Sequence, residues 1–216
     1  MVGGDVLIRS LKVVLLLISS LVLLAACSEK EKLDVSNNSP EAEVSLTPVD
    51  LFQEEGAKFQ PFLGSMSGAF KLSYEGKRPN AKLDIDIWQN GKVTSFGSIG
   101  DVFFSSGDRQ KSEVEVIISI DTVSIGEGQN QYHIIKVGMI QERGSSLATY
   151  SLPWDNRLSA RGLISNSEPR IFIANEPIHV WGMQATSSNE IHTADLSEES
   201  LNKLEWGLIF TLRFEK

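Results

Sequence analysis

Alternation of apolar and polar side chains at every second position is the feature that most restricts the fold of this chain. Residues 70–75 alternate Phe, Leu and Tyr with Lys, Ser and Glu, and residues 82–87 alternate Lys and Asp with Leu and Ile. Neighbouring side chains of a strand point to opposite faces, so this period predicts strands with one buried and one wet face. A similar pattern occurs at 113–121, and residues 132–140, 147–152, 170–174 and 178–185 are further strand candidates.

The clearest predicted strand is the last one. Five large apolar side chains recur at spacing two from Trp206 to Phe214. An edge strand this apolar would invite aggregation, so we expect it inside a sheet with neighbours on both sides. Thr211 and Arg213 fall on the opposite face, where substitution of Thr211 is expected to be mild.

One dipeptide predicts a tight turn between two of these strands. Asn90-Gly91 separates 85–88 from 93–96 and suits a type I′ turn. Together the patterns predict eight to ten short strands with one or two short helices. Antiparallel pairing of such strands gives a sandwich or a barrel, and the uneven strands and long loops favour an all-β antiparallel β-sandwich.

The N-terminus has a different pattern, typical of a secretory signal. Arg9 and Lys12 precede an apolar run over 13–26 that is interrupted only by two serines. A helix of about fourteen residues rises only about 21 Å, against a hydrocarbon core of about 30 Å. The run is therefore expected to be a cleaved signal rather than a membrane span.

Small residues and a cysteine end this run. The stretch Leu24-Ala25-Ala26-Cys27 resembles the lipobox of bacterial lipoproteins. The resemblance implies cleavage before Cys27, diacylglyceryl transfer to its thiol, and often acylation (for example with palmitate) of the new amino group. It predicts a protein held on the extracytoplasmic face of a cell membrane, with the membrane as a partner through lipid on Cys27. Two or three acyl chains hold a protein durably, whereas one does so only marginally.

The sequence predicts three parts: a signal peptide over 1–26, a lipidated cysteine and flexible tether over 27–47, and a β-rich domain over 48–216. The tether is polar and has no aromatic residue, so deleting 29–45 is expected to leave folding intact. A Pro after Thr47 predicts one or two helical turns from Thr47 to Gly56. Phe59 and Phe62 are expected to dock this segment on the domain.

Charge and cysteine content exclude several classes of function. The formal net charge is -8, and an acidic surface is repelled by nucleic acid, so no nucleic-acid partner is expected. With one cysteine, the chain has neither a disulfide framework nor a site built on several thiolates.

The metal-ligating residue types are not spaced as known metal motifs. Asp84 and Asp86 stand two apart, but Trp88 occupies the fifth position of a would-be calcium loop, so a solvated strand face is the preferred interpretation. His133, His179 and His192 have no zinc spacing. We therefore expect no metal and no cofactor.

Tryptophans are the most informative candidates for binding. Trp88, Trp154 and Trp181 lie on a polar strand face, in a loop and in a strand, and exposed tryptophans form platforms for sugars or peptides. The alternative is that they pack under loops. The chain is expected to be a non-catalytic binding module for an envelope protein, a wall polymer or a small ligand. The alternatives are an envelope hydrolase with unidentified catalytic carboxylates, and an assembly subunit that uses the last strand.

Overall fold

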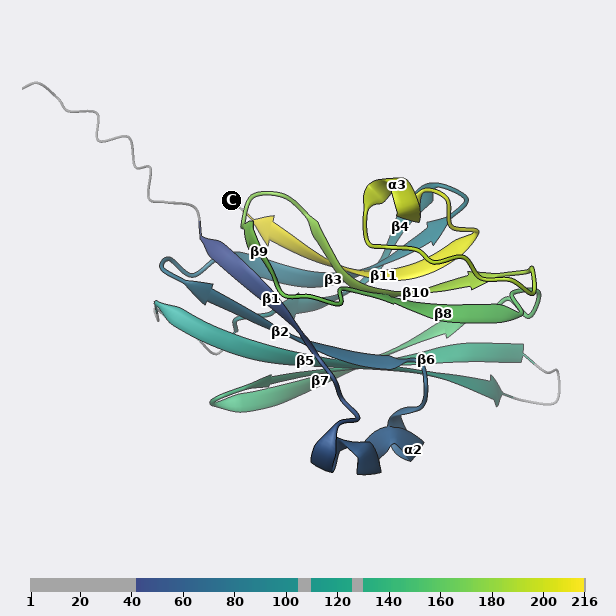
Figure 1. Cartoon of the computed structure of the whole chain (residues 1–216), viewed down its shortest axis with the longest axis horizontal. Helices are drawn as coiled ribbons and strands as arrows, with labels where there is room; N and C mark the ends of the chain where they lie inside the picture. Colours follow the sequence, from purple (N-terminus) through teal and green to yellow (C-terminus); the bar gives the residue numbers. More distant parts are fainter. Residues whose placement is uncertain (1–41, 105–109, 126–129, 216) are drawn as a thin grey trace, which may run out of the picture. The chain divides into compact units, whose positions relative to one another are not determined.

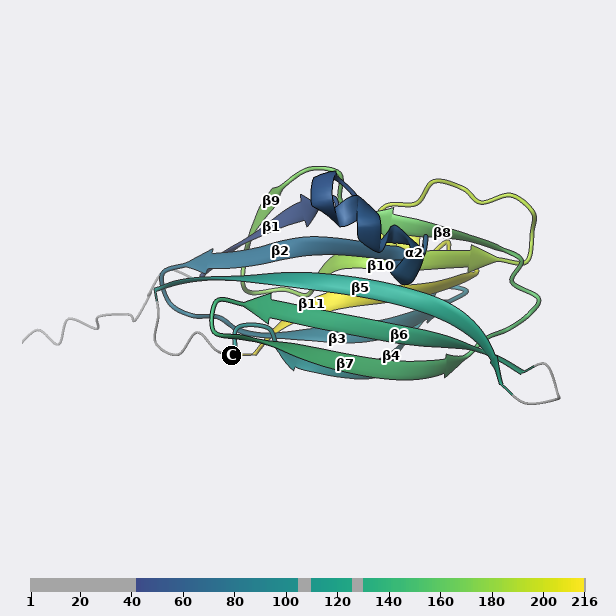
Figure 2. The same cartoon turned by 90° about the horizontal axis from the view of Figure 1, so that it is seen from below.

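The domain is a β-sandwich, as the alternation predicts. The computed structural model describes residues 42–104, 110–125 and 130–215. Two antiparallel sheets pack face to face, and the core lies between them (Figures 1 and 2). The predicted signal peptide and Cys27 lie outside the described residues.

The first sheet has six strands, in the order β7-β6-β5-β2-β1-β9. Its longest strand, β5, pairs with β2 over residues 111–119 on one edge and with β6 over residues 114–125 on the other. The strands are β7 (Gly144–Pro153), β6 (Asn130–Gln141), β5 (Lys111–Ile125), β2 (Ser67–Glu75), β1 (Glu43–Val49) and β9 (Arg170–Ile173).

The second sheet has five strands, in the order β4-β3-β11-β10-β8. They are β4 (Lys92–Asp101), β3 (Asn80–Gln89), β11 (Trp206–Glu215), β10 (Ile178–Thr186) and β8 (Ala160–Ser165). Asn90 and Gly91 connect β3 to β4, with φ angles of 50° and 74°. Positive φ at both positions is what a type I′ turn requires, so the predicted hairpin is confirmed.

The last strand lies inside its sheet, as expected. β11 pairs with β3 on one side and with β10 on the other. Leu208, Phe210 and Leu212 are fully buried in the core between the sheets. The expectation of a tolerant opposite face is wrong, because Ile209 and Thr211 on that face are also fully buried.

A small apolar cluster on the outer face of the sheet buries Ile209. Helix α3 (Glu198–Leu201) covers the outer face of the second sheet (Figure 1). The Ser197 side chain caps it by accepting a hydrogen bond from the Ser200 backbone N–H. Leu201 of this helix forms a cluster with Leu204, which follows the helix, and with Trp88, Ile164 and Ile209 of the sheet.

The sequence-based boundary between tether and domain is wrong at its C-terminal end. Strand β1 begins at Glu43, and Val44 and Leu46 have exposures of 0% and 1%. β1 also pairs with both β2 and β9. Deletion of residues 29–45 would therefore remove part of the sheet and of the core.

The entry helix also differs from the expectation. Thr47 and Pro48 belong to β1, and the helical turns follow later, as the 3-10 helix η1 (Glu54–Phe59) and the α-helix α2 (Gln60–Leu63). Phe59 and Phe62 do not dock the segment, because their side chains are 51% and 79% exposed. No helix in the described part of the chain is long and apolar enough to cross a membrane.

Candidate functional site

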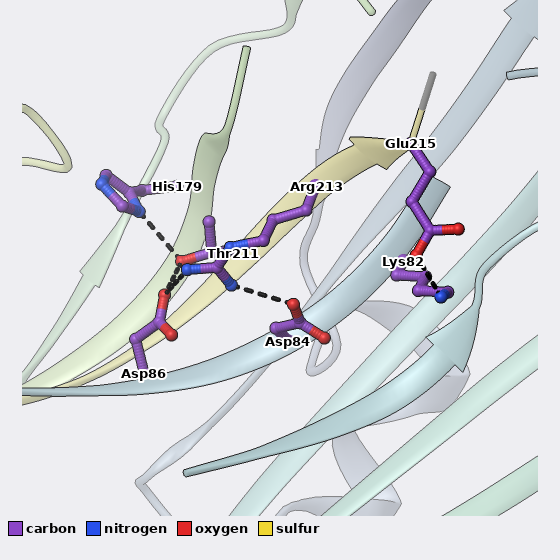
Figure 3. Close-up of polar contacts among 7 residues, drawn as sticks. All are labelled: Lys82, Asp84, Asp86, His179, Thr211, Arg213 and Glu215. Atoms are coloured by element: carbon purple, nitrogen blue, oxygen red, sulfur yellow. Dashed lines mark hydrogen bonds and ion pairs between the residues drawn. The ribbon is translucent and has the colours of Figure 1, made fainter. Parts of the chain in front are cut away.

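Five polar side chains from three strands meet on the outer face of the second sheet (Figure 3). The Arg213 guanidinium donates from Nη1 to Asp84 Oδ2 at 3.0 Å and from Nη2 to Asp86 Oδ2 at 2.7 Å. The Thr211 hydroxyl also donates to Asp86 Oδ2, at 2.7 Å, and His179 Nδ1 lies 3.0 Å from the same hydroxyl. We call Asp84, Asp86, His179, Thr211 and Arg213 the polar network.

Burial makes the charges of this network depend on one another. Asp86 has an exposure of 1%, and a buried carboxylate is costly unless it is paired and hydrogen-bonded. Burial lowers the pKa of Arg213, but the hydrogen bonds and charges of Asp86 and Asp84 outweigh it and hold this pKa above its usual value. Arg213 thus stays charged and bridges the two carboxylates.

The hydroxyl of Thr211 sets the tautomer of His179. A hydroxyl has one proton, which Thr211 gives to Asp86, so it accepts a hydrogen bond from His179 Nδ1–H. Burial lowers the pKa of His179, more than the nearby Asp86 charge raises it. His179 is therefore neutral and Nδ1-protonated at pH 7, and its Nε2 lone pair is left available as an acceptor.

This arrangement corrects the interpretation of Asp84 and Asp86 as a solvated strand face. Asp86 is buried, and Lys82 forms its own ion pair with Glu215 farther along the two strands. Asp86 Oδ1 has no hydrogen-bond partner among the residues that the structure describes. Over the same residues, no group of three or more His, Cys, Asp and Glu side chains is placed to hold a metal ion.

Trp88 lies beside the polar network, under helix α3. Its side chain is 6% exposed and contacts the edge of the His179 ring at a centroid distance of 5.7 Å. Leu201 and Leu204 cover the Trp88 ring, so it presents little surface to a ligand.

Trp154 closes one end of the sandwich. Its ring packs against His133 at a centroid distance of 4.0 Å and against Trp206 at 5.4 Å. The Arg161 guanidinium lies 5.7 Å from the same ring and donates a hydrogen bond to the Thr122 hydroxyl. The half-buried Trp154 is thus a lid on the core rather than a free platform.

His133 is the buried titratable group of this end. Its side chain has an exposure of 0%, its Nδ1 lies 3.1 Å from the Thr122 hydroxyl, and its Nε2 is buried without a partner in the described structure. Burial, together with the positive charge of Arg161, lowers its pKa to about 4. His133 is therefore neutral at pH 7.

Trp181 differs from the other two, because it belongs to the core and also lines a cavity. Its exposure is 2%, and its ring packs against Phe210 at a centroid distance of 5.6 Å. A Cβ placed on Gly68 would lie 2.3 Å from Trp181 Nε1, so β2 needs glycine there for the indole to fit. The indole is thereby held in place beside the cavity.

The cavity lies between β1 and β2 of the first sheet and β8 and β10 of the second, and its volume is about 240 Å³. It forms because β9 pairs with Glu43–Leu46 of β1 and stops there, which leaves Thr47–Val49 without that neighbour. We call it the edge cavity. Its lining consists of Leu46, Pro48, Val49, Asp50, Leu51, Phe52, Ser67, Gly68, Ala69, Phe70, Leu163, Ser165, Asn166, Val180 and Trp181.

The structure therefore does not bring the three tryptophans together. Trp88, Trp154 and Trp181 lie in an outer cluster, at an end of the sandwich and at the edge cavity. Sequence reasoning missed the other cavity residues and also Arg213 as the partner of Asp84 and Asp86. The pairing of β11 with β3 brings Arg213 to these acids, and the residues around Arg213 in the sequence do not predict that pairing. No protein-family model matches the chain, and neither a curated protein nor a solved structure does.

We expect Arg213→Met to lower the free energy of unfolding by about 3–5 kcal/mol, because it leaves Asp86 buried without its cation. Lys82→Met is the matched control on the same face. It breaks the exposed Lys82–Glu215 pair and should change stability little. Urea unfolding of both variants is the measurement. Equal, small losses of stability in both variants would show that the polar network does not stabilise the fold. If it does, adding Asp86→Leu to Arg213→Met should recover much of the stability lost.

Acid should weaken the fold through His133. Its folded pKa of about 4 lies below the ordinary 6.5, so the unfolded chain binds the proton more readily. The stability it contributes is complete above pH 6.5 and is lost as the pH falls toward 4, by about 3 kcal/mol. His133→Gln should flatten this part of the pH dependence, while His192→Gln, at an exposed position, should not. Parallel curves for all three proteins would contradict the assignment.

Proposed function

We propose that this chain is a bacterial lipoprotein, anchored through Cys27 on the extracytoplasmic face of a membrane, whose β-sandwich is a non-catalytic binding module. The edge cavity is the observation that carries the binding part. It is open to solvent between the two sheets, and Trp181 and Phe70 form apolar walls. Ligand sites have this character: a mostly apolar concavity with a few polar groups at fixed places.

The chemistry of the lining favours binding over hydrolysis. Asp50 is the one titratable side chain among the described residues that line the cavity, and it accepts a hydrogen bond from the Phe52 backbone N–H at 3.0 Å. Hydrolysis by carboxylates needs a second acid or base within reach of the same substrate. Asp84 and Asp86, which stand two positions apart on β3, are both bound by Arg213.

Cavity size restricts the ligand. A volume of about 240 Å³ is below the roughly 300–1,000 Å³ of sites that hold drug-sized molecules. The cavity fits a small apolar group, either a free molecule or the side chain of an envelope partner. Ser165 offers a hydroxyl group for orientation, whereas the Asn166 amide is held by hydrogen bonds to Val180 and Arg170.

Small aromatic probes test the cavity. We expect indole or p-xylene to shift the Trp181 indole N–H resonance while leaving that of Trp88 in place. Leu163→Trp should fill the cavity mouth and weaken binding roughly tenfold or more, which is about 1.4 kcal/mol. Leu147→Trp, at a 71% exposed leucine, is the matched control and should bind as the wild type does. Equal binding by both variants would place the ligand elsewhere.

Cys27→Ala tests the anchor. The variant should carry no lipid and accumulate as uncleaved precursor or released protein, since the lipid-bearing thiol is gone. The mass of the mature protein and its recovery with membranes are the measurements. Unchanged mass and membrane retention would show that Cys27 is not the anchoring residue.

A further inference from the structure

The helical segment Glu54–Leu63 leaves its apolar side chains in solvent. None of its residues is buried, in η1 or in α2. Phe62 is 79% exposed and Phe59 is 51% exposed. Phe62 is the most exposed of the large hydrophobic side chains in the described residues.

The two rings lie on the same side of this segment. Residues three positions apart are neighbours on a helix surface, and Phe59 has helical φ and ψ angles at the start of α2. The end of the segment is held on the first sheet by polar contacts instead. Ser119 donates a hydrogen bond to the Leu63 carbonyl at 3.0 Å, and Ser67 donates one to the Gly64 carbonyl at 2.7 Å. These bonds fix the backbone and leave the rings uncovered.

We infer that Phe59 and Phe62 insert into the headgroup boundary of the bilayer that carries the Cys27 lipid. This inference rests on the proposed anchor. Amphipathic helices lie in that boundary with the Phe, Trp or Leu side chains of one face out of water. Alone, such a contact is weak; the anchor makes it effective by keeping the segment at a high local concentration next to the membrane.

The length of chain between Cys27 and the domain allows this contact. Sixteen residue steps separate Cys27 from Glu43, where β1 begins, and they span at most about 53–58 Å. β1 itself adds about 20 Å before the chain turns toward η1. The Phe59 and Phe62 rings are therefore within reach of the bilayer that holds the lipid.

The area of the two rings suits a bilayer better than a protein partner. A phenylalanine side chain offers about 150–250 Å², so the exposed fractions of Phe59 and Phe62 amount to roughly 200–300 Å². A stable protein interface buries about 800 Å² on each partner. Two rings are too small for that, but they are enough to orient a domain that is already anchored.

Charge indicates that the contact is apolar. Glu54, Glu55 and Lys58 give the segment a net charge of -1, so anionic headgroups would not attract it. A zwitterionic phosphatidylcholine vesicle is accordingly a sufficient partner for a test.

A label on the ring position tests the inference in the lipidated full chain. Cys27 is the one cysteine, so in the lipidated protein Phe62→Cys supplies the one free thiol for an environment-sensitive fluorophore. In phosphatidylcholine vesicles we expect its emission to shift to the blue and to be largely quenched by lipids that carry a quencher in the acyl chain. Adding Phe59→Ser should weaken both effects. Lys203→Cys, at a side chain that is 70% exposed shortly after α3, is the matched control and should show neither. Helices α2 and α3 lie on opposite sides of the sandwich (Figure 1).

The possible outcomes separate this inference from the proposed anchor. A label at position 62 that stays in water while the protein remains on the vesicles would overturn the membrane contact alone. A blue shift that appears without vesicles and rises with protein concentration would overturn it in favour of a second copy of the chain. If the wild-type protein itself takes up the thiol label, Cys27 is free and the anchor proposal fails, whatever position 62 reports.

Discussion

Burial of β11 on both of its faces is the constraint on which the rest of the domain depends. Its inner face, with Phe210 at the centre, is packed against the first sheet. Its outer face is divided between Ile209, which lies under helix α3, and Thr211, which belongs to the polar network. A strand in this position must be paired along both edges, and β3 and β10 provide that pairing.

The polar network ties this arrangement to one register. A slip of one residue would turn the side chain of Arg213 into the core and move Phe210 or Leu212 outward. In the observed register Arg213 reaches both Asp84 and Asp86 from the neighbouring strand. A register that moved Arg213 away from Asp86 would leave this carboxylate buried without its cation, which is costly. The polar network therefore favours the observed register of β11 on β3.

Local sequence was sufficient for most of the strands and for their general packing. The pattern of apolar residues predicted the strands that follow residue 66 except β8, and Asn90-Gly91 predicted the β3–β4 turn. These features depend on φ and ψ preferences and on a period of two, which neighbouring residues determine. The same reasoning missed β1, because its alternation is limited to Val44 and Leu46 and directly follows a polar segment, so only the pairing with β2 and β9 marks it as a strand.

The sequence by itself determined that the chain forms amphipathic antiparallel strands, that its last strand lies inside a sheet and that Cys27 ends a signal-like segment. Only the tertiary structure decided which faces are covered. It buried Asp86 against Arg213, separated the three tryptophans, opened the edge cavity beside Trp181 and left Phe62 in solvent. The physical reason is that a side chain's period sets the face on which it lies. What covers that face depends on segments more than a hundred residues away.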